Sequence, residues 1–272
     1  MGIGNLTGLV DWWGLLVAAV IFLPIERFIP LHKMQPVLRG GWTADIFYIL
    51  VNGIFVRVGL VLLLTALLFA AKWIVPLGFR AAIAHQAWWL QCVEAVIVGD
   101  FCLYWTHRAL HANAYLWRFH SVHHAIEELD WVAAYHNHPI DELMLNGAAL
   151  GSVYALGFSP AAIAVYVAIF GWVSFAVHAN TRIRIGWFRW LFSSPEFHHW
   201  HHSNEREARD HNFASVLSLW DVTFGTVFLP RGRVPAVYGI DQNMPPTYAD
   251  QLLHPFRRRA TPDAISAVQA GD

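Results

Sequence analysis

The feature that most restricts the fold of this chain is a set of four long apolar stretches with few charges. They cover about residues 8–29, 46–70, 88–106 and 143–177. A membrane-spanning helix needs about 20 predominantly apolar residues, and the first three stretches predict one span each. The fourth is broken by Gly157-Phe158-Ser159-Pro160, a turn sequence that predicts a hairpin of two helices.

Composition excludes the main alternatives to a membrane protein. Only 14% of the residues are charged, against about 25% in a typical soluble domain. So few charges cannot cover the surface of a soluble globule of this size. The net charge of -1 gives no basic field, so nothing indicates a nucleic-acid partner. The start of the chain lacks the basic residues of a cleaved signal, so we expect the first apolar stretch to remain as an anchor.

The placement of arginine predicts the orientation of the spans. Most arginines follow His178, and placing that basic part inside puts the N-terminus outside. Segments 107–138 and 178–230, which hold most of the sixteen histidines, then emerge together on the cytoplasmic face. We expect N-terminal transmembrane helices and loops over 1–90, a catalytic domain with further membrane helices over 91–230, and a polar tail over 231–272.

Three histidine clusters are the main chemical signal. They are formed by His107 and His111; by His120, His123 and His124; and by His198, His201 and His202. Helical residues three or four apart share one face, so we expect each cluster to aim two or three imidazoles at a common point. Buried imidazoles cannot all satisfy one another without a cation or protons. The clusters therefore predict metal binding.

The number of imidazoles indicates two metal ions with open coordination positions. A tetrahedral zinc site takes four ligands, and imidazole suits zinc, copper, iron and nickel. Vacant coordination beside a bilayer points to dioxygen chemistry on apolar chains, which favours iron. Isolated histidines such as His32, His85 and His254 are more simply explained as satisfied core or interface residues.

The histidine clusters belong to a longer ordered set of motifs between about Asp100 and Thr226. The set comprises Asp100-x3-Tyr104-Trp105-x-His107-Arg108-x2-His111, Leu116-Trp117-x2-His120-x2-His123-His124, His138-Pro139-x-Asp141, His178-x-Asn180, Pro195-x2-His198-x2-His201-His202, Asn212-Phe213 and Trp220-Asp221-x2-Phe224-Gly225-Thr226. This order resembles the fatty acid hydroxylase / sterol desaturase superfamily of membrane di-iron enzymes. One His-x3-His motif is weak evidence, whereas the complete order is highly specific.

The resemblance implies an all-α fold, with a multi-pass transmembrane stem and a cytoplasmic histidine-rich helical cap that holds a di-metal site. It implies two iron ions as cofactor, O2 as co-substrate and a membrane lipid as substrate. The metal ligands that it implies are His107, His111, His120, His123, His124, His178, His198, His201 and His202. No His-Pro-Gly-Gly haem-binding signature is present, so we expect a separate electron donor of the cytochrome b5, ferredoxin or reductase type.

Groups that support the ligands can be predicted separately, because a ligating histidine usually donates its other N–H to a carboxylate or carbonyl. The available carboxylates are Asp100, Glu127, Glu128, Asp130, Asp141, Glu196, Asp210 and Asp221. Asp100 lies two helical turns before His107, inside a predicted span where an ionisable group is costly. We expect catalytic roles for Asp100, His138 and Asp221. The motif favours His136 and His138 as supports, and His199 as a packing or supporting residue, and it leaves His211 open.

These observations favour hydroxylation of an acyl chain, sterol or related lipid, with desaturation as the alternative within the same family. A membrane metal-binding or transport protein is the alternative from another class, as is a structural protein that has lost catalysis. A transporter would line its path with histidines, whereas the predicted spans contain almost none. The lipid substrate, the identity of the electron donor and the oligomeric state stay open.

Overall fold

The computed structural model describes residues 12–257, and every regular element in that range is a helix. The α-helices are α1 (Trp12–Phe28), α2 (Trp42–Phe47), α3 (Gly53–Ile74), α4 (Leu77–Ala84), α5 (Trp88–Ala112), α6 (Ala114–His124), α7 (Pro139–Leu156), α8 (Pro160–His178), α9 (Pro195–His201), α10 (Leu219–Phe224) and α11 (Tyr248–Leu253). A π-helical turn, η2 (Tyr48–Asn52), joins α2 to α3. The 3-10 helices are η3 (Trp131–Tyr135), η4 (Gly186–Trp190) and η5 (His254–Phe256). The expected all-α class is confirmed.

Two helices within residues 12–257 are long and apolar enough to cross a membrane. They are the continuous helix Trp42–Ile74 and α8, and the first of them matches the second predicted span. Helices α4 and α5 make a third if the pair, which is bent by 120°, forms one span. Helix α1 has 17 residues, and the beginning of the first predicted span lies outside the described residues. The apolar side chains of α3 are widely exposed, as expected for an integral membrane protein.

The predicted hairpin over 143–177 is present as α7 and α8. Gly157 ends α7 with φ 94°, a left-handed conformation that favours glycine. The Ser159 side chain accepts a hydrogen bond from the Ala162 N–H, and Pro160 occupies the first position of α8. Both residues are typical of a helix start. The turn chemistry of the sequence therefore gave the boundary between the two helices correctly.

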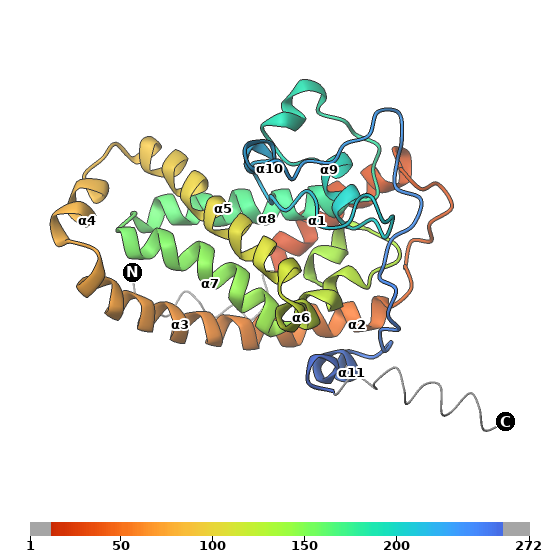
Figure 1. The fold of residues 1–272 in the computed structure, drawn as a ribbon, viewed down its shortest axis with the longest axis horizontal. Coiled ribbons are helices and arrows are strands. Elements are labelled where there is room, and N and C mark those ends of the chain that lie inside the picture. The colour runs from red at the N-terminus through yellow and green to blue at the C-terminus, as the bar shows by residue number, and fades with distance from the viewer. Residues whose placement is uncertain (1–11, 258–272) are drawn as a thin grey trace.

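The long helices pack closely through small residues. A Cβ atom added to Gly147 of α7 would lie 2.5 Å from a methyl carbon of Leu63, and one added to Gly99 of α5 would lie 2.6 Å from the Tyr166 ring. Small residues at such contacts let membrane helices approach one another. Helices α3, α5, α7 and α8 run along the long axis of the molecule, with α4 at one end and α6, α9 and α10 toward the other (Figure 1). That second end carries the histidine clusters.

Candidate metal centre

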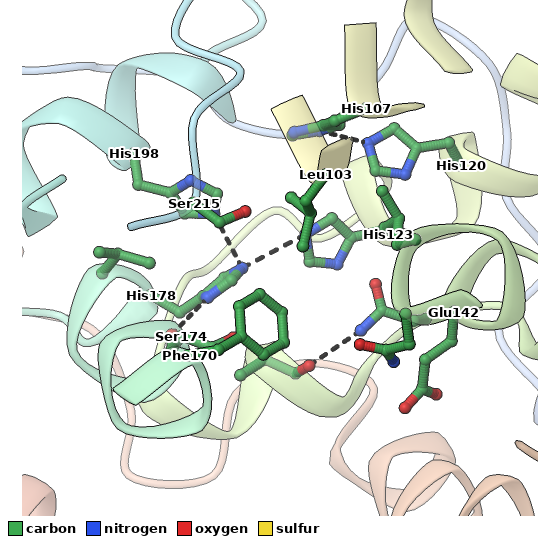
Figure 2. A pocket seen from close by; sticks show the side chains of 15 residues that line it. Leu103, His107, His120, His123, Glu142, Phe170, Ser174, His178, His198 and Ser215 are labelled. Carbon is green, nitrogen blue, oxygen red and sulfur yellow. Dashed lines mark hydrogen bonds between the residues drawn. The ribbon is translucent and has the colours of Figure 1, made fainter. Parts of the chain in front are cut away.

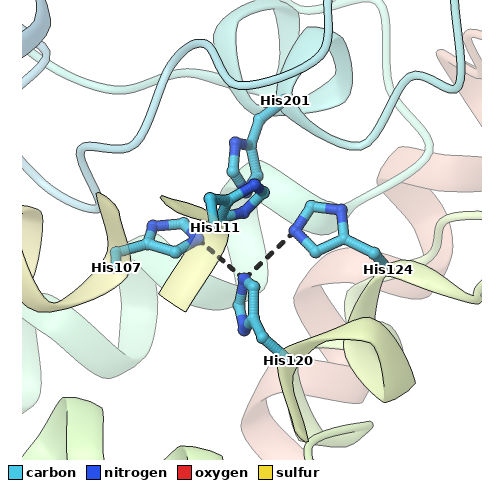
Figure 3. A group of neighbouring side chains, drawn as sticks. All are labelled: His107, His111, His120, His124 and His201. Carbon is cyan, nitrogen blue, oxygen red and sulfur yellow. Dashed lines mark hydrogen bonds between the residues drawn. The ribbon is translucent and has the colours of Figure 1, made fainter. Parts of the chain in front are cut away.

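All nine histidines that the sequence predicted as ligands lie in two groups at this end of the helices. The five-histidine group contains His107, His111, His120, His124 and His201 (Figure 3). The four-histidine group contains His123, His178, His198 and His202. Within each group the candidate ligand nitrogens all lie within 4.8 Å of one another. The structure thus brings the nine side chains together, and their role as ligands stays a prediction.

The Nε2 atoms converge at spacings that suit a metal ion. In the five-histidine group, His120 Nε2 lies 2.9 Å from His107 Nε2 and 3.1 Å from His124 Nε2. In the four-histidine group, His178 Nε2 lies 3.3 Å from His123 Nε2 and 3.0 Å from His198 Nε2. Metal–imidazole bonds of about 2.0–2.1 Å place neighbouring ligand nitrogens roughly 3 Å apart. The spacing therefore fits one ion in each group.

Unpartnered nitrogens support the same interpretation. The Nε2 atoms of His111 and His201 are buried and have no hydrogen-bond partner among the described residues. A buried polar atom without a partner is costly, and both atoms belong to the five-histidine group. A bound cation would satisfy them, so this donor set fits a metal.

One short segment, residues 210–213, orients three histidines of the five-histidine group through their Nδ1 atoms. His111 Nδ1 donates to Asp210 Oδ1 at 3.2 Å, and His201 Nδ1 donates to the His211 carbonyl at 2.8 Å. His107 Nδ1 donates to the Phe213 carbonyl at 2.6 Å. Each bond leaves the Nε2 lone pair directed at the centre of the group, as ligating histidines require.

The backbone of this segment is strained. Asp210 and Asn212 adopt φ values of 59° and 60°, a left-handed conformation that Asp and Asn tolerate better than other non-glycine residues. The Asn212 amide donates to the carbonyls of Phe197 and Phe228. These bonds fix the turn, because they connect it to α9 and to the loop that follows α10.

Asp100 and Asp221, for which catalytic roles were predicted, hold the backbone that continues from this segment. Asp221 accepts from the Phe213 and Ala214 N–H groups, each at 2.8 Å. Asp100 accepts from the N–H groups of Val216 and Leu217 at 2.9 and 2.8 Å. The contacts of both carboxylates place them behind the segment that orients the imidazoles.

A fourth histidine of the five-histidine group, His120, is oriented by a carboxylate on α7. His120 Nδ1 lies 3.0 and 3.1 Å from the two oxygens of Asp141, whose side chain is fully buried. Asp141 follows His138-Pro139 at the start of α7. His138, also predicted as catalytic, lies outside both groups: its Nδ1 accepts from the Ile140 N–H and its Nε2 donates to the Leu252 carbonyl. Its described contacts fix the start of α7.

The four-histidine group is oriented by backbone carbonyls of the surrounding helices and turns. His178 Nδ1 donates to the Ser174 carbonyl one turn earlier in α8, at 2.7 Å. His123 Nδ1 donates to the His136 carbonyl at 3.1 Å. The Nδ1 atoms of His198 and His202 are buried without a partner among the described residues. This group therefore depends on α8 and η3 rather than on segment 210–213.

Each cluster aims two of its imidazoles at a common point, as expected, but the third histidine of each three-membered cluster enters the other group. His120 and His124 enter the five-histidine group, whereas His123 between them enters the other. His198 and His202 likewise share the four-histidine group, and His201 joins the five. The reason is helical geometry, since residues four apart share a face while neighbours in sequence differ by about 100°.

The remaining histidines of this region act as supports. His199 Nε2 donates to the Ala179 carbonyl, and its Nδ1 lies 2.7 Å from the Tyr238 hydroxyl, so it packs α9 against the end of α8. His136 Nδ1 donates to Asp45 at 2.6 Å. His211 supplies the carbonyl that orients His201.

Burial favours neutral imidazoles at the site. It lowers the pKa of His120, His124 and His201 well below the ordinary value, and neighbouring imidazoles add to the effect. The pKa values of His198 and His202 are lowered well below the ordinary value in the same way. Neutral histidines expose the lone pair that a metal needs.

Two hollows reach the histidine groups from different sides. An inner cavity of about 100 Å³ is lined by His107 and His120 of one group and by His123, His178 and His198 of the other (Figure 2). Leu103, Leu145, Phe170 and Val177 give it apolar walls. An outer pocket of about 400 Å³ is lined by His111, His124 and His201 together with polar residues that include Arg209 and Asp241. The five-histidine group therefore touches both hollows.

The groups that orient most of the nine histidines could not be predicted from the sequence. The carbonyls of Phe213, His136 and Ser174 have no signal in side-chain chemistry, because every residue carries one. Asp45 was also missed, although its carboxylate holds both His136 and Arg39. Its place beside an apolar stretch was the available signal. Asp141 and Asp210, in contrast, were among the carboxylates considered.

Comparisons with known proteins agree with the site. A family model described as fatty acid hydroxylase matches residues 92–226. The ornithine lipid hydroxylase OlsE of Rhizobium tropici is 31% identical over 64% of this chain and 53% of its own length. The human alkylglycerol monooxygenase is 29% identical over 54% of this chain and 32% of its own. A putative methylsterol monooxygenase of Dictyostelium discoideum is 27% identical over 75% of this chain and 78% of its own.

The match to the first two of these relatives is partial. This chain spans about half the length of OlsE and about a third of the length of the alkylglycerol monooxygenase. No solved structure matches the chain significantly.

Proposed function

The chain belongs to the fatty acid hydroxylase / sterol desaturase superfamily, and from this premise we propose that it hydroxylates a lipid C–H bond with two iron ions and O2. The relatives' names cover an ornithine lipid, an alkylglycerol and a methylsterol. The proposed substrate class is therefore a membrane lipid. Desaturation of such a lipid is the alternative outcome of the test below.

The observation that carries the proposal is the pair of histidine groups beside one cavity. Each group offers four or five buried nitrogens that are held neutral by burial, and each fits one ion. We propose the nine histidines as the ligands of two irons. Bound there, iron would supply the activation of dioxygen that an unactivated C–H bond requires.

The protein's own part is to position the lipid and to exclude water. The inner cavity touches both histidine groups and has mainly apolar walls, so it suits the reacting part of a lipid. Segment 210–213 and Asp141 fix the imidazole rings, which keeps the ligand lone pairs in place without rearrangement. Asp100, Asp221 and His138 support the proposed ligands indirectly, because their side chains hydrogen-bond the backbone near these histidines.

We propose that electrons arrive from a separate donor protein at the outer pocket, on the cytoplasmic face. His111, a proposed ligand, hydrogen-bonds Asp210, whose side chain is 72% exposed. The ligands His124 and His201 line the same pocket. A donor bound over it would therefore come close to the five-histidine group.

The test compares lipid extracts from the native host with the gene deleted, restored, or restored as His123→Ala, with matched protein levels in the membrane. We expect a lipid that gains one oxygen only with the wild-type gene and under air. A lipid that loses two hydrogens instead would identify a desaturase. The absence of any histidine-dependent change, in a protein that binds about two irons per chain, would contradict lipid oxidation.

A further inference from the structure

An acidic side chain, Glu142 of α7, lines the inner cavity that touches both histidine groups (Figure 2). The other polar lining residues outside the histidine groups are Asn137, Asn146, Ser174 and Ser215, and the lining contains no lysine or arginine. The cavity wall thus offers one carboxylate and several neutral hydrogen-bonding groups in addition to the proposed metal ligands. Metal binding as assigned above uses none of these groups.

The position of Glu142 depends on a distortion of the helix that faces it. Glu142 hydrogen-bonds the Asn52 side chain, and Asn52 is the last residue of the π-helical turn η2. Asn52 also donates to the Asn137 carbonyl at 2.6 Å and accepts from the Tyr248 hydroxyl at 2.9 Å. Single π-helical turns occur frequently at functional sites. In this protein the turn places Asn52, a polar residue within an otherwise apolar helix, against the carboxylate of Glu142.

A carboxylate in such a cavity requires a compensating partner. Burying a charge without one is expensive, and a single amide hydrogen bond offsets only part of that cost. The lining supplies no cation of its own, because it contains no lysine or arginine and its five histidines are the proposed metal ligands. Burial accordingly raises the pKa of the Glu142 carboxyl group to about 7. A positive group that enters the cavity, or the metal ions themselves, would keep this group ionised.

We propose that Glu142 binds an ammonium group of the lipid substrate inside the cavity, with Asn146 as a second contact. The proposal rests on the proposed function, in that it takes the inner cavity as the substrate site. It narrows the substrate class to lipids with a cationic amine close to the oxidised carbon. An ion pair with a carboxylate is stronger than a hydrogen bond between neutral groups, so Glu142 would select such lipids over alcohols of equal chain length.

The test measures binding rather than turnover. The full-length protein, loaded with iron and kept in detergent, is titrated with dodecylamine or dodecanol, and bound molecules are counted by native mass spectrometry. We expect the wild type to bind the amine about tenfold more tightly than the alcohol. The near-isosteric Glu142→Gln should reduce this ratio to about one. Glu127→Gln changes an exposed carboxylate outside the cavity and should leave the ratio as in the wild type.

A second variant keeps the proposal testable if Glu142→Gln does not fold. Asn146→Asp adds a carboxylate to the same cavity and should raise the preference for the amine. Equal binding of amine and alcohol by the wild type would overturn the proposal, as would an unchanged ratio in Glu142→Gln. A loss of iron in Glu142→Gln would assign the carboxylate to the metals instead. Amine binding without any oxidised lipid would contradict the proposed function and leave this site intact.

Discussion

The two histidine groups both draw on α6 and α9 but are held in different ways. Four ligands of the five-histidine group are oriented from outside its own helices, three by segment 210–213 and one by Asp141. The four-histidine group relies on the carbonyls of Ser174 and His136, within and beside α8 and η3. The first group faces the outer pocket as well as the inner cavity, and the second lines the inner cavity only. One site is therefore maintained by a separable segment and the other by the helical framework.

Removing a ligand should have the largest effect, and α6 offers a matched pair. His120→Ala and His123→Ala each remove one imidazole, three residues apart, from different groups. We expect each variant to bind about one iron instead of two and to lose activity by roughly 10³-fold or more, because the metal supplies several kcal/mol of transition-state stabilisation. Metal analysis of the purified protein and lipid oxidation in cells provide the measurements.

His199→Gln is the control for this pair, because His199 lies between ligands on α9 and makes only supporting contacts. It should retain both irons. Loss of both irons from His199→Gln would show that metal retention reports on folding alone.

Asp141→Asn should have the next largest effect, restricted to the five-histidine group. The substitution weakens the charge-assisted bond to His120 Nδ1, and changes in such supporting residues typically cost about 10–100-fold in metal affinity. Competition with a calibrated chelator measures the two affinities. The exposed Asp250→Asn serves as the control. An equal loss at both groups would contradict the separate support that the structure indicates.

Asp221→Asn should destabilise segment 210–213, which carries the hydrogen-bond acceptors of three histidines. Burial raises the pKa of Asp221 to about 6, and its hydrogen bonds oppose that rise. Loss of one charged acceptor for the Phe213 and Ala214 N–H groups should lower the free energy of unfolding by about 2 kcal/mol. Thermal unfolding in detergent measures this change, and metal analysis should show loss from the five-histidine group first. Asp221 bonds the end of segment 210–213, whereas Asp100 bonds residues 216 and 217. A faster loss of that metal from Asp100→Asn than from Asp221→Asn would therefore contradict the more direct support expected from Asp221.

Asp210→Asn should have the smallest effect, since the Asp210 side chain is largely exposed. Exposed pairs are worth about 0–1 kcal/mol, so we expect a two- to fivefold faster loss of one metal to a chelator. In the wild type we expect two phases, with the five-histidine group emptied first through the outer pocket. Stopped-flow absorbance resolves the phases. Acceleration of the slow phase by this variant would refute the proposed order.

Much of this architecture could be predicted from the sequence, and the exceptions have physical causes. The hairpin was readable because Gly157, Ser159 and Pro160 act locally. Eight of the nine histidines that the structure brings together could be predicted because their spacing is unusual, whereas His178 was expected only from the family resemblance. Their partition into groups could not be predicted, since His123 and His124 are neighbours in sequence and enter different groups.

The contact between Asn52 and Glu142 could not be predicted from the sequence either. An isolated Asn in an apolar helix predicts a polar contact, but only the π-helical turn determines that this contact is a carboxylate in the cavity. Such a distortion depends on tertiary packing, which local sequence patterns do not encode.

Main-chain acceptors have a consequence for how this site tolerates mutation. Among the six described Nδ1 bonds of the nine histidines, four end on backbone carbonyls, those of Phe213, His136, Ser174 and His211. Replacing any of these four side chains leaves the acceptor oxygen in place. Alanine scanning would therefore underestimate how many positions build the site, and homologous proteins can vary at these positions while the imidazoles keep their orientation.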